Sequence, residues 1–150
     1  MNKFYQVSTP WINKLEKKNV NLALKNNEIS GFFGRYIPEF EGQFSNFCKS
    51  KYAVAVNSGT TALHLALVTL GIKKGDEVIV SSLTNMASIF AILYIGAIPI
   101  PIDIESETYN LDVNLIEDKI TKKTTAILAV HLFGHPADMD KILKISKKYK

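Results

Sequence analysis

Four short apolar segments, separated by helix-forming stretches, set the fold class of this chain. They are residues 52–57, 77–81, 98–102 and 125–131. Each shows little alternation between apolar and polar side chains, which is typical of strands that are buried on both faces of a sheet. Helix-forming residues follow each segment, so strand and helix alternate along the chain. One such helix is predicted at residues 113–119 with Asp112 as its N-cap, and Asp138 is the predicted N-cap of the last helix. The pattern predicts an α/β fold, in which a parallel sheet is flanked by helices.

The first fifty residues follow a different pattern. Apolar residues at helical spacing predict one helix between Pro10 and Leu24, and a second helix is predicted at about residues 39–48. The second helix carries three aromatic side chains that fall on one face, namely Phe40, Phe44 and Phe47. We therefore expect a helical N-terminal arm over residues 1–50 and a sheet-containing domain over residues 51–150.

Composition restricts the class of protein. No apolar run approaches the roughly 20 residues that a membrane span needs, and the N-terminus lacks the apolar core of a signal peptide. The single cysteine, Cys48, excludes an internal disulfide and fits a reducing cytoplasm. The net charge is +4, but Arg35 is the only arginine among 18 basic residues, which argues against a nucleic-acid site. We expect a soluble cytoplasmic protein that binds neither nucleic acid nor membrane.

Polar residues follow each predicted strand. They lie at residues 57–60, 81–86, 103–105 and 131–136. Because parallel strands end at one edge of their sheet, these residues should share a rim, and the carboxyl ends of such strands are where ligands bind. The sequence therefore predicts a ligand site at this edge.

The turn at Ser58, Gly59 and Thr60 is the clearest candidate within that rim. It joins a predicted strand to a predicted helix, so the N–H groups of Gly59 and Thr60 should be unpaired and able to bind a phosphate. The glycine patterns of dinucleotide-binding folds and P-loops are absent, as is the nucleophile elbow.

His131 and His135 are four residues apart, but Gly134 breaks any helix between them, so no metal site is predicted.

Several segments together resemble the DegT/DnrJ-type sugar aminotransferases. The similarity runs from about residue 31 to residue 150. It rests on residues 55–63, 75–80, 96–99 with Asp103, 108–112 and 130–139. The resemblance implies fold type I, pyridoxal 5'-phosphate as cofactor, and transfer of an amino group from glutamate to a nucleotide-linked keto sugar.

The resemblance also assigns residues to the site. Gly59 and Thr60 match the positions that bind the cofactor phosphate. Asn85 stands where the family usually has an aromatic residue on the pyridine ring, so it is predicted to contact the ring or the sugar, with Met86 as an alternative cover for the ring. Residues 82–88 resemble the perosamine synthases, which implies amination at C4 of a GDP-linked 4-keto-6-deoxy sugar for surface polysaccharides such as lipopolysaccharide.

The resemblance places the Schiff-base lysine beyond residue 150, so no catalytic residue is assigned within the chain. Residues 51–150 are accordingly predicted to be the N-terminal part of a truncated cofactor-binding large domain that is inactive alone. The full protein is expected to be a homodimer. Two alternatives stay open: a non-catalytic module that binds a phosphorylated ligand, and a related sugar dehydratase in which histidine replaces the lysine.

Overall fold

The computed structural model describes residues 8–149, which divide between Ala55 and Val56 into two compact units. The first unit contains helices α1 (Lys14–Lys25) and α2 (Tyr36–Phe47). A capping box begins α1: the Asn13 side chain accepts a hydrogen bond from the N–H of Leu15, and the Glu16 carboxylate accepts one from the N–H of Asn13. Both helices predicted for the N-terminal part are thus confirmed, although α1 begins after Pro10 and α2 begins before residue 39.

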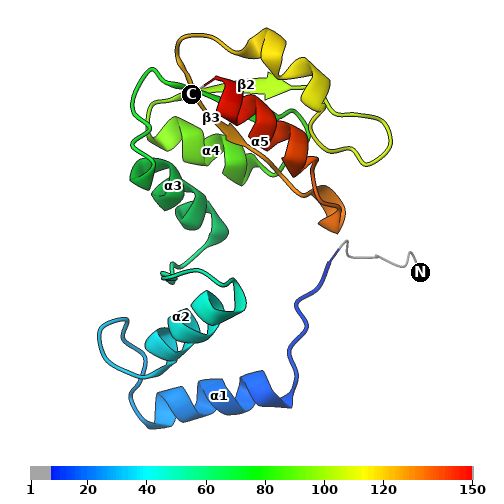
Figure 1. Ribbon diagram of the computed structural model, residues 1–150. Helices are drawn as coiled ribbons and strands as arrows, with labels where there is room; N and C mark the ends of the chain where they lie inside the picture. Colours follow the sequence, from blue (N-terminus) through cyan, green and yellow to red (C-terminus); the bar gives the residue numbers. More distant parts are fainter. Residues whose placement is uncertain (1–7, 150) are drawn as a thin grey trace, which may run out of the picture. The chain divides into compact units, whose positions relative to one another are not determined.

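The second unit alternates helices and strands. In chain order it contains α3 (Gly59–Thr69), β1 (Glu77–Ser81), α4 (Met86–Tyr94), β2 (Ile98–Ile102), the 3₁₀ turns η1 (Val113–Leu115) and η2 (Glu117–Lys119), β3 (Thr124–Leu128), the 3₁₀ turn η3 (Leu132–Gly134) and α5 (Met139–Lys148). The strands form one parallel sheet in the order β2-β1-β3, which Figure 1 shows with its helices. The predicted α/β class is confirmed.

Strand β1 lies at the centre of the sheet and is buried on both faces. Val78 and Val80 pack in one apolar cluster, which includes Leu67 of α3 and Ile92 of α4. Ile79, the residue between the two valines, belongs to a second cluster on the opposite face, with side chains that include Ile102, Ile116 and Ile142. This split follows from the two-residue period of a strand. It confirms the prediction that the sheet is covered on both sides.

The predicted strand at residues 52–57 is wrong. This segment has no regular structure, and Tyr52 and Val54 are 74% and 69% exposed. A strand exists only through hydrogen bonds to a neighbouring strand, and no strand among the described residues pairs with this segment. The apolar composition therefore indicates that this segment could pair as a strand, but the described residues contain no strand that pairs with it.

Two other boundaries also differ from expectation. The last strand ends at Leu128, three residues before the predicted limit, and residues 113–119 form the two short 3₁₀ turns rather than one helix. The predicted caps are nevertheless present. The Asp112 side chain accepts from the N–H of Asn114, and the Asp138 side chain accepts from the N–H of Lys141 at the start of α5.

Prolines close the outer edge of β2. The N–H of Ile98 donates to the carbonyl of Asp76, next to β1, at 2.7 Å, so residues of even number turn their N–H groups toward β1. The intervening residues, Pro99 and Pro101, face outward and carry no N–H group. An edge without donors cannot accept a further strand in the usual way. The sheet therefore ends at β2.

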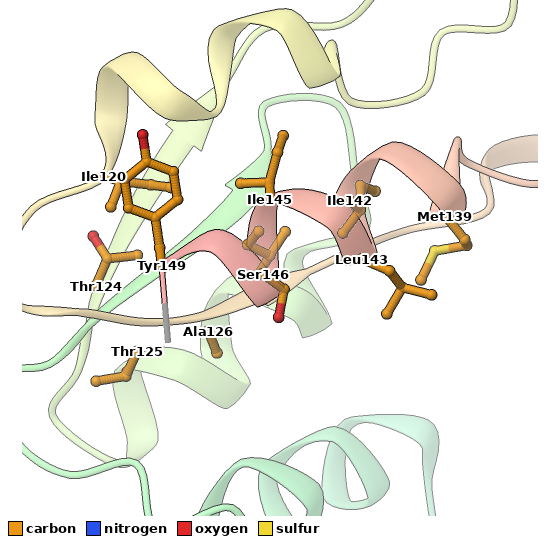
Figure 2. Close-up of a pocket in the computed structure, with 11 residues that line it drawn as sticks. Ile120, Thr124, Thr125, Ala126, Met139, Ile142, Leu143, Ile145, Ser146 and Tyr149 are labelled. Carbon is orange, nitrogen blue, oxygen red and sulfur yellow. The ribbon is translucent and has the colours of Figure 1, made fainter.

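The outer edge of β3 is open by comparison, because β3 pairs only with β1 among residues 8–149. A groove runs between β3 and α5, and Figure 2 shows its lining side chains, which include Thr124, Thr125 and Ala126 from β3, Ile145 and Ser146 from α5, and Tyr149 directly after α5. The lining runs along β3 from Thr124 to Ile127 and along α5 from Met139, so the groove follows the length of this outer strand. We therefore assign it to the sheet edge and not to the ligand site.

Within residues 8–149, every helix is too short or too polar to cross a membrane.

The open edge predicts how the 150-residue chain behaves in isolation. Thr125→Lys places a charge on this edge, and we expect it to raise the soluble fraction after expression, because lysine blocks edge-to-edge pairing of strands. Thr69→Lys adds the same charge at the exposed end of α3 and serves as the control. Equal soluble fractions for the two variants, measured by sedimentation and light scattering, would contradict the assignment of the free edge.

Candidate functional site

The turn before α3 is held by side chains and leaves backbone donors free. Ser58 is the N-cap, and its Oγ accepts from the N–H of Thr61 at 3.2 Å. Thr61 Oγ1 in turn donates to Asn57 Oδ1 at 2.8 Å. Among the described residues, no acceptor reaches the N–H groups of Gly59 or Thr60. Two donors therefore lie at the positive end of the helix dipole, where an anion is stabilised.

Gly59 is not crowded by the rest of the fold. A Cβ atom built on Gly59 has no heavy atom within 4 Å among its non-neighbouring residues, so a larger residue could also occupy the first position of α3. A phosphate group can accept hydrogen bonds from both N–H groups at such a position. These donors fit the phosphate of pyridoxal phosphate, and the contact of that phosphate with Gly59 and Thr60 stays a prediction.

Asn85 also lies at a helix N-terminus. It is the N-cap of α4, and its Oδ1 accepts from the N–H of Ala87 at 2.9 Å. The preceding turn is fixed by a 2.8 Å hydrogen bond between the hydroxyls of Thr84 and the buried Ser88. Capping uses the side-chain oxygen of this exposed residue, and its amide N–H₂ makes no hydrogen bond among the described residues. Its predicted contact with the cofactor ring or the sugar stays a prediction.

Helices α3 and α4 belong to the same packed body. Leu63 and Leu67 of α3 share an apolar cluster with Ala91 and Ile92 of α4. The two predicted binding segments therefore lie at the N-termini of helices that cover the same face of the sheet. No hydrogen bond within the described residues joins Gly59 or Thr60 to Asn85.

The rim at the end of β3 is organised by a buried asparagine. Asn110 is 4% exposed, and its Oδ1 accepts from the N–H of Leu132 at 2.9 Å. Its Nδ2 lies within hydrogen-bonding distance of the carbonyls of His135 and Pro136, at 3.1 and 3.3 Å. Sequence reasoning assigned Asn110 no role, because the groups it binds lie 22 to 26 residues further along the chain. No local pattern signals such a contact.

The two histidines of this rim are engaged with the backbone. His131 Nδ1 accepts from the N–H of Ala137 at 3.0 Å, and His135 Nδ1 lies 3.1 Å from the carbonyl of Pro136. In the part of the chain that the structure describes, no three His, Cys, Asp or Glu side chains come together as a metal site would require. The histidines thus shape the loop at residues 131–137.

Glu105, after β2, is linked to the same asparagine. Its carboxylate accepts from the hydroxyl of Thr108 and from the N–H of Glu107 at 2.7 Å. The Thr108 hydroxyl oxygen also lies 3.0 Å from Asn110 Nδ2. The hydrogen bond from the Thr108 hydroxyl, followed by that from the N–H of Glu107, lowers the pKa of Glu105. A continuous polar network therefore joins the end of β2 to the loop after β3.

Comparison with known proteins shows which family the chain matches. Residues 10–150 match the DegT/DnrJ/EryC1/StrS aminotransferase family. The chain is 48% identical, over 97% of its length, to GDP-perosamine synthase of Escherichia coli O157:H7. It spans about 40% of the length of that relative.

Solved structures give the same fold. The aminotransferase from Psychrobacter cryohalolentis is 38% identical with a TM-score of 0.89, over 94% of this chain and 36% of that one. GDP-4-keto-6-deoxy-D-mannose-3-dehydratase of E. coli, solved with bound hydrated pyridoxal phosphate, is 32% identical with a TM-score of 0.85, over 96% of this chain and 38% of that one. The fold is therefore that of fold type I pyridoxal-phosphate proteins.

The polar network at Glu105 predicts a pH-dependent stability. Because the pKa of the folded state lies below the ordinary value of 4.5, the ionised carboxylate stabilises the fold above that pH, and the stabilisation is lost as the pH falls through the lowered pKa. We expect Glu105→Gln to unfold at lower urea concentration than the wild type at neutral pH, and the difference to shrink in acid.

Glu107→Gln is the matched control for this measurement, because the Glu107 carboxylate accepts no hydrogen bond among the described residues. A difference between wild type and Glu105→Gln that stays constant from neutral pH into acid would contradict the role given to the Glu105 carboxylate.

Proposed function

The chain belongs to the DegT/DnrJ/EryC1/StrS aminotransferase family, and from this premise we propose that it is the N-terminal part of a sugar aminotransferase. The whole protein uses pyridoxal phosphate to move an amino group from glutamate to a nucleotide-linked keto sugar. Its substrate is a GDP-linked 4-keto-6-deoxy sugar, by similarity to GDP-perosamine synthase of E. coli O157:H7 and of Caulobacter vibrioides. Residues 51–150 form part of the cofactor-binding domain, and residues 1–50 form an N-terminal arm.

The free donors at the N-terminus of α3 carry this proposal. The N–H groups of Gly59 and Thr60 bind the cofactor phosphate, because no acceptor among the described residues reaches them and they lie at the positive end of the helix dipole. Ser58 keeps that turn in place by capping the helix. A phosphate bound there fixes one end of the cofactor, so the ring lies toward the carboxyl ends of the strands.

Asn85 completes the proposed contribution of this chain. Its side-chain oxygen is held by α4, so its amide N–H₂ is pre-positioned to donate to the cofactor ring or to a sugar hydroxyl. When bound, pyridoxal phosphate supplies an electron sink that allows the amino group to leave one carbon and join another. The lysine required for that chemistry comes from outside residues 1–150, and the chain alone is inactive.

The proposed setting is the synthesis of surface polysaccharide, including lipopolysaccharide. A relative named spore coat polysaccharide biosynthesis protein SpsC, from Bacillus subtilis, is 40% identical to this chain. We place the enzyme in the cytoplasm, and we propose that it is a homodimer in which the N-terminal arm contributes contacts to the partner or the substrate.

A dehydratase is the second candidate. The likeness to GDP-4-keto-6-deoxy-D-mannose-3-dehydratase, at a TM-score of 0.85, favours the same class of sugar substrate with a different outcome. Identity to that protein is 32%, against 48% to GDP-perosamine synthase of E. coli O157:H7, which favours aminotransfer. A non-catalytic phosphate-binding module is the third candidate and predicts binding without turnover.

Product analysis separates the three candidates. The full-length protein is incubated with pyridoxal phosphate, glutamate and GDP-4-keto-6-deoxy-D-mannose. We expect glutamate to change the absorbance of the cofactor, and mass spectrometry to detect an amino sugar. A deoxygenated sugar without added nitrogen would support the dehydratase instead, and a bound sugar without product would support the module.

A pair of variants at Gly59 tests the phosphate contact in the full-length protein. Gly59→Pro removes one donor, and proline is tolerated at the first position of a helix. Because a hydrogen bond to a charged group contributes about 1.5–3 kcal/mol, we expect the Kd for pyridoxal phosphate to rise roughly 10- to 100-fold. Gly59→Ala keeps the N–H and should bind as the wild type does. Equal affinity of both variants, measured by cofactor absorbance titration, would exclude this donor.

A further inference from the structure

The loop after β3 holds an aromatic residue in an unusual backbone conformation. Phe133 has φ 51° and ψ 24°, in the left-handed region, and its side chain is 85% exposed. Bulky residues avoid this region because the Cβ atom approaches the following carbonyl oxygen. Gly134, which follows it, is also left-handed, with φ 83°, but glycine adopts that conformation without strain. The strain at this loop therefore lies on Phe133.

The loop is held in this conformation by Asn110. The side-chain amide of Asn110 contacts the N–H of Leu132 on one side of Phe133 and the carbonyl of His135 on the other, at 2.9 and 3.1 Å. Because the amide is buried and fully engaged, releasing the loop would leave polar groups without partners. Strained residues persist where the surroundings impose them, and they concentrate at functional sites.

The place of the loop in the fold connects it to the site. Leu128 ends β3, so residues 131–137 lie beyond the carboxyl end of that strand, at the same edge of the parallel sheet as Ser82 and Asn85 after β1. Figure 1 shows the loop protruding beyond the end of β3. An aromatic ring exposed at this edge offers a flat apolar face beside the ligand-binding rim.

We propose that Phe133 contacts the nucleotide sugar and that Asn110 is the positioning residue that holds it there. This inference rests on the proposed function for the identity of the ligand. The ring of Phe133 packs on a flat face of the ligand, either the base or the sugar ring. Asn110 does not touch the ligand and acts by fixing the backbone on both sides of Phe133.

Variants of Phe133 in the full-length protein test the contact. Phe133→Gly removes the ring and relieves the backbone strain, so the variant is expected to fold at least as well as the wild type. We expect its Kd for GDP-4-keto-6-deoxy-D-mannose, measured by calorimetry, to rise about tenfold, an effect typical of losing an aromatic contact. Phe133→Tyr keeps the ring and should bind nearly as the wild type does. A second titration of Phe133→Gly with GDP alone distinguishes contact with the base from contact with the sugar ring. Weaker GDP binding than in the wild type indicates the base, and unchanged GDP binding indicates the sugar.

Variants of Asn110 test the positioning. Asn110→Asp keeps an acceptor for the N–H of Leu132 but turns a carboxylate oxygen toward the carbonyls of His135 and Pro136, so the loop should be released. We expect faster hydrogen exchange at residues 132–137 and a nucleotide-sugar Kd raised as in Phe133→Gly. Asn114→Ala, which removes an exposed amide that contacts Asp112, should change neither quantity.

The outcomes separate this inference from the proposed function. Wild-type affinity for the nucleotide sugar in Phe133→Gly, while glutamate still changes the cofactor absorbance, would overturn the inference and leave aminotransfer intact. Binding that depends on Phe133, without any absorbance change on adding glutamate, would reject aminotransfer and support the inference. A Phe133→Gly variant that alters only the oligomeric state would also overturn it, because Phe133 would then face another subunit.

Discussion

The burial of β1 on both faces is the constraint on which the second unit depends. Val78, Ile79 and Val80 are each fully buried, and their alternating directions divide the core into two clusters. At about 25 cal/mol for each Å² of apolar surface removed from water, these three side chains are a major source of the stability of the unit. Because helices must cover both faces, the connections cross from strand to strand in parallel. All strands therefore end at one edge, where the candidate site lies.

The polar features of the structure are arranged around that edge. Helix N-termini at Ser58 and Asn85 present donors or caps, and the network from Glu105 through Asn110 fixes the loop that follows β3. The two outer edges of the sheet differ in their ability to pair with a further strand. Prolines remove the outward donors of β2, whereas β3 keeps an open edge and a groove under α5. The sheet can therefore be extended past β3 and not past β2.

Sequence patterns predicted the features that depend on neighbouring residues. The apolar runs located β1 and β2 at their observed limits, and Ser58, Asp112 and Asp138 were recognised as turn or cap residues because a cap binds groups two or three residues away. Features that depend on distant partners were not predictable in this way. Residues 52–57 have the composition of a strand but lack a partner among residues 8–149.

The residues of the candidate site also divide into those that a local sequence rule predicts and those that depend on distant segments. Gly59 and Thr60 follow from the local rule that helix N-termini have free donors. Asn110 does not, since its contacts join segments that only the folded sheet brings together. The left-handed backbone of Phe133 is imposed by those same contacts, and no pattern in the residues around it indicates a positive φ. Family resemblance supplied the cofactor, which the helix geometry alone would have left as an unspecified anion.

A crystal structure of the full-length protein with pyridoxal phosphate tests the account most directly. We expect phosphate oxygens to lie within hydrogen-bonding distance, about 2.7–3.2 Å, of the backbone nitrogens of both Gly59 and Thr60, with the ring toward Asn85. A cofactor phosphate bound elsewhere, with these two N–H groups left to solvent, would contradict it.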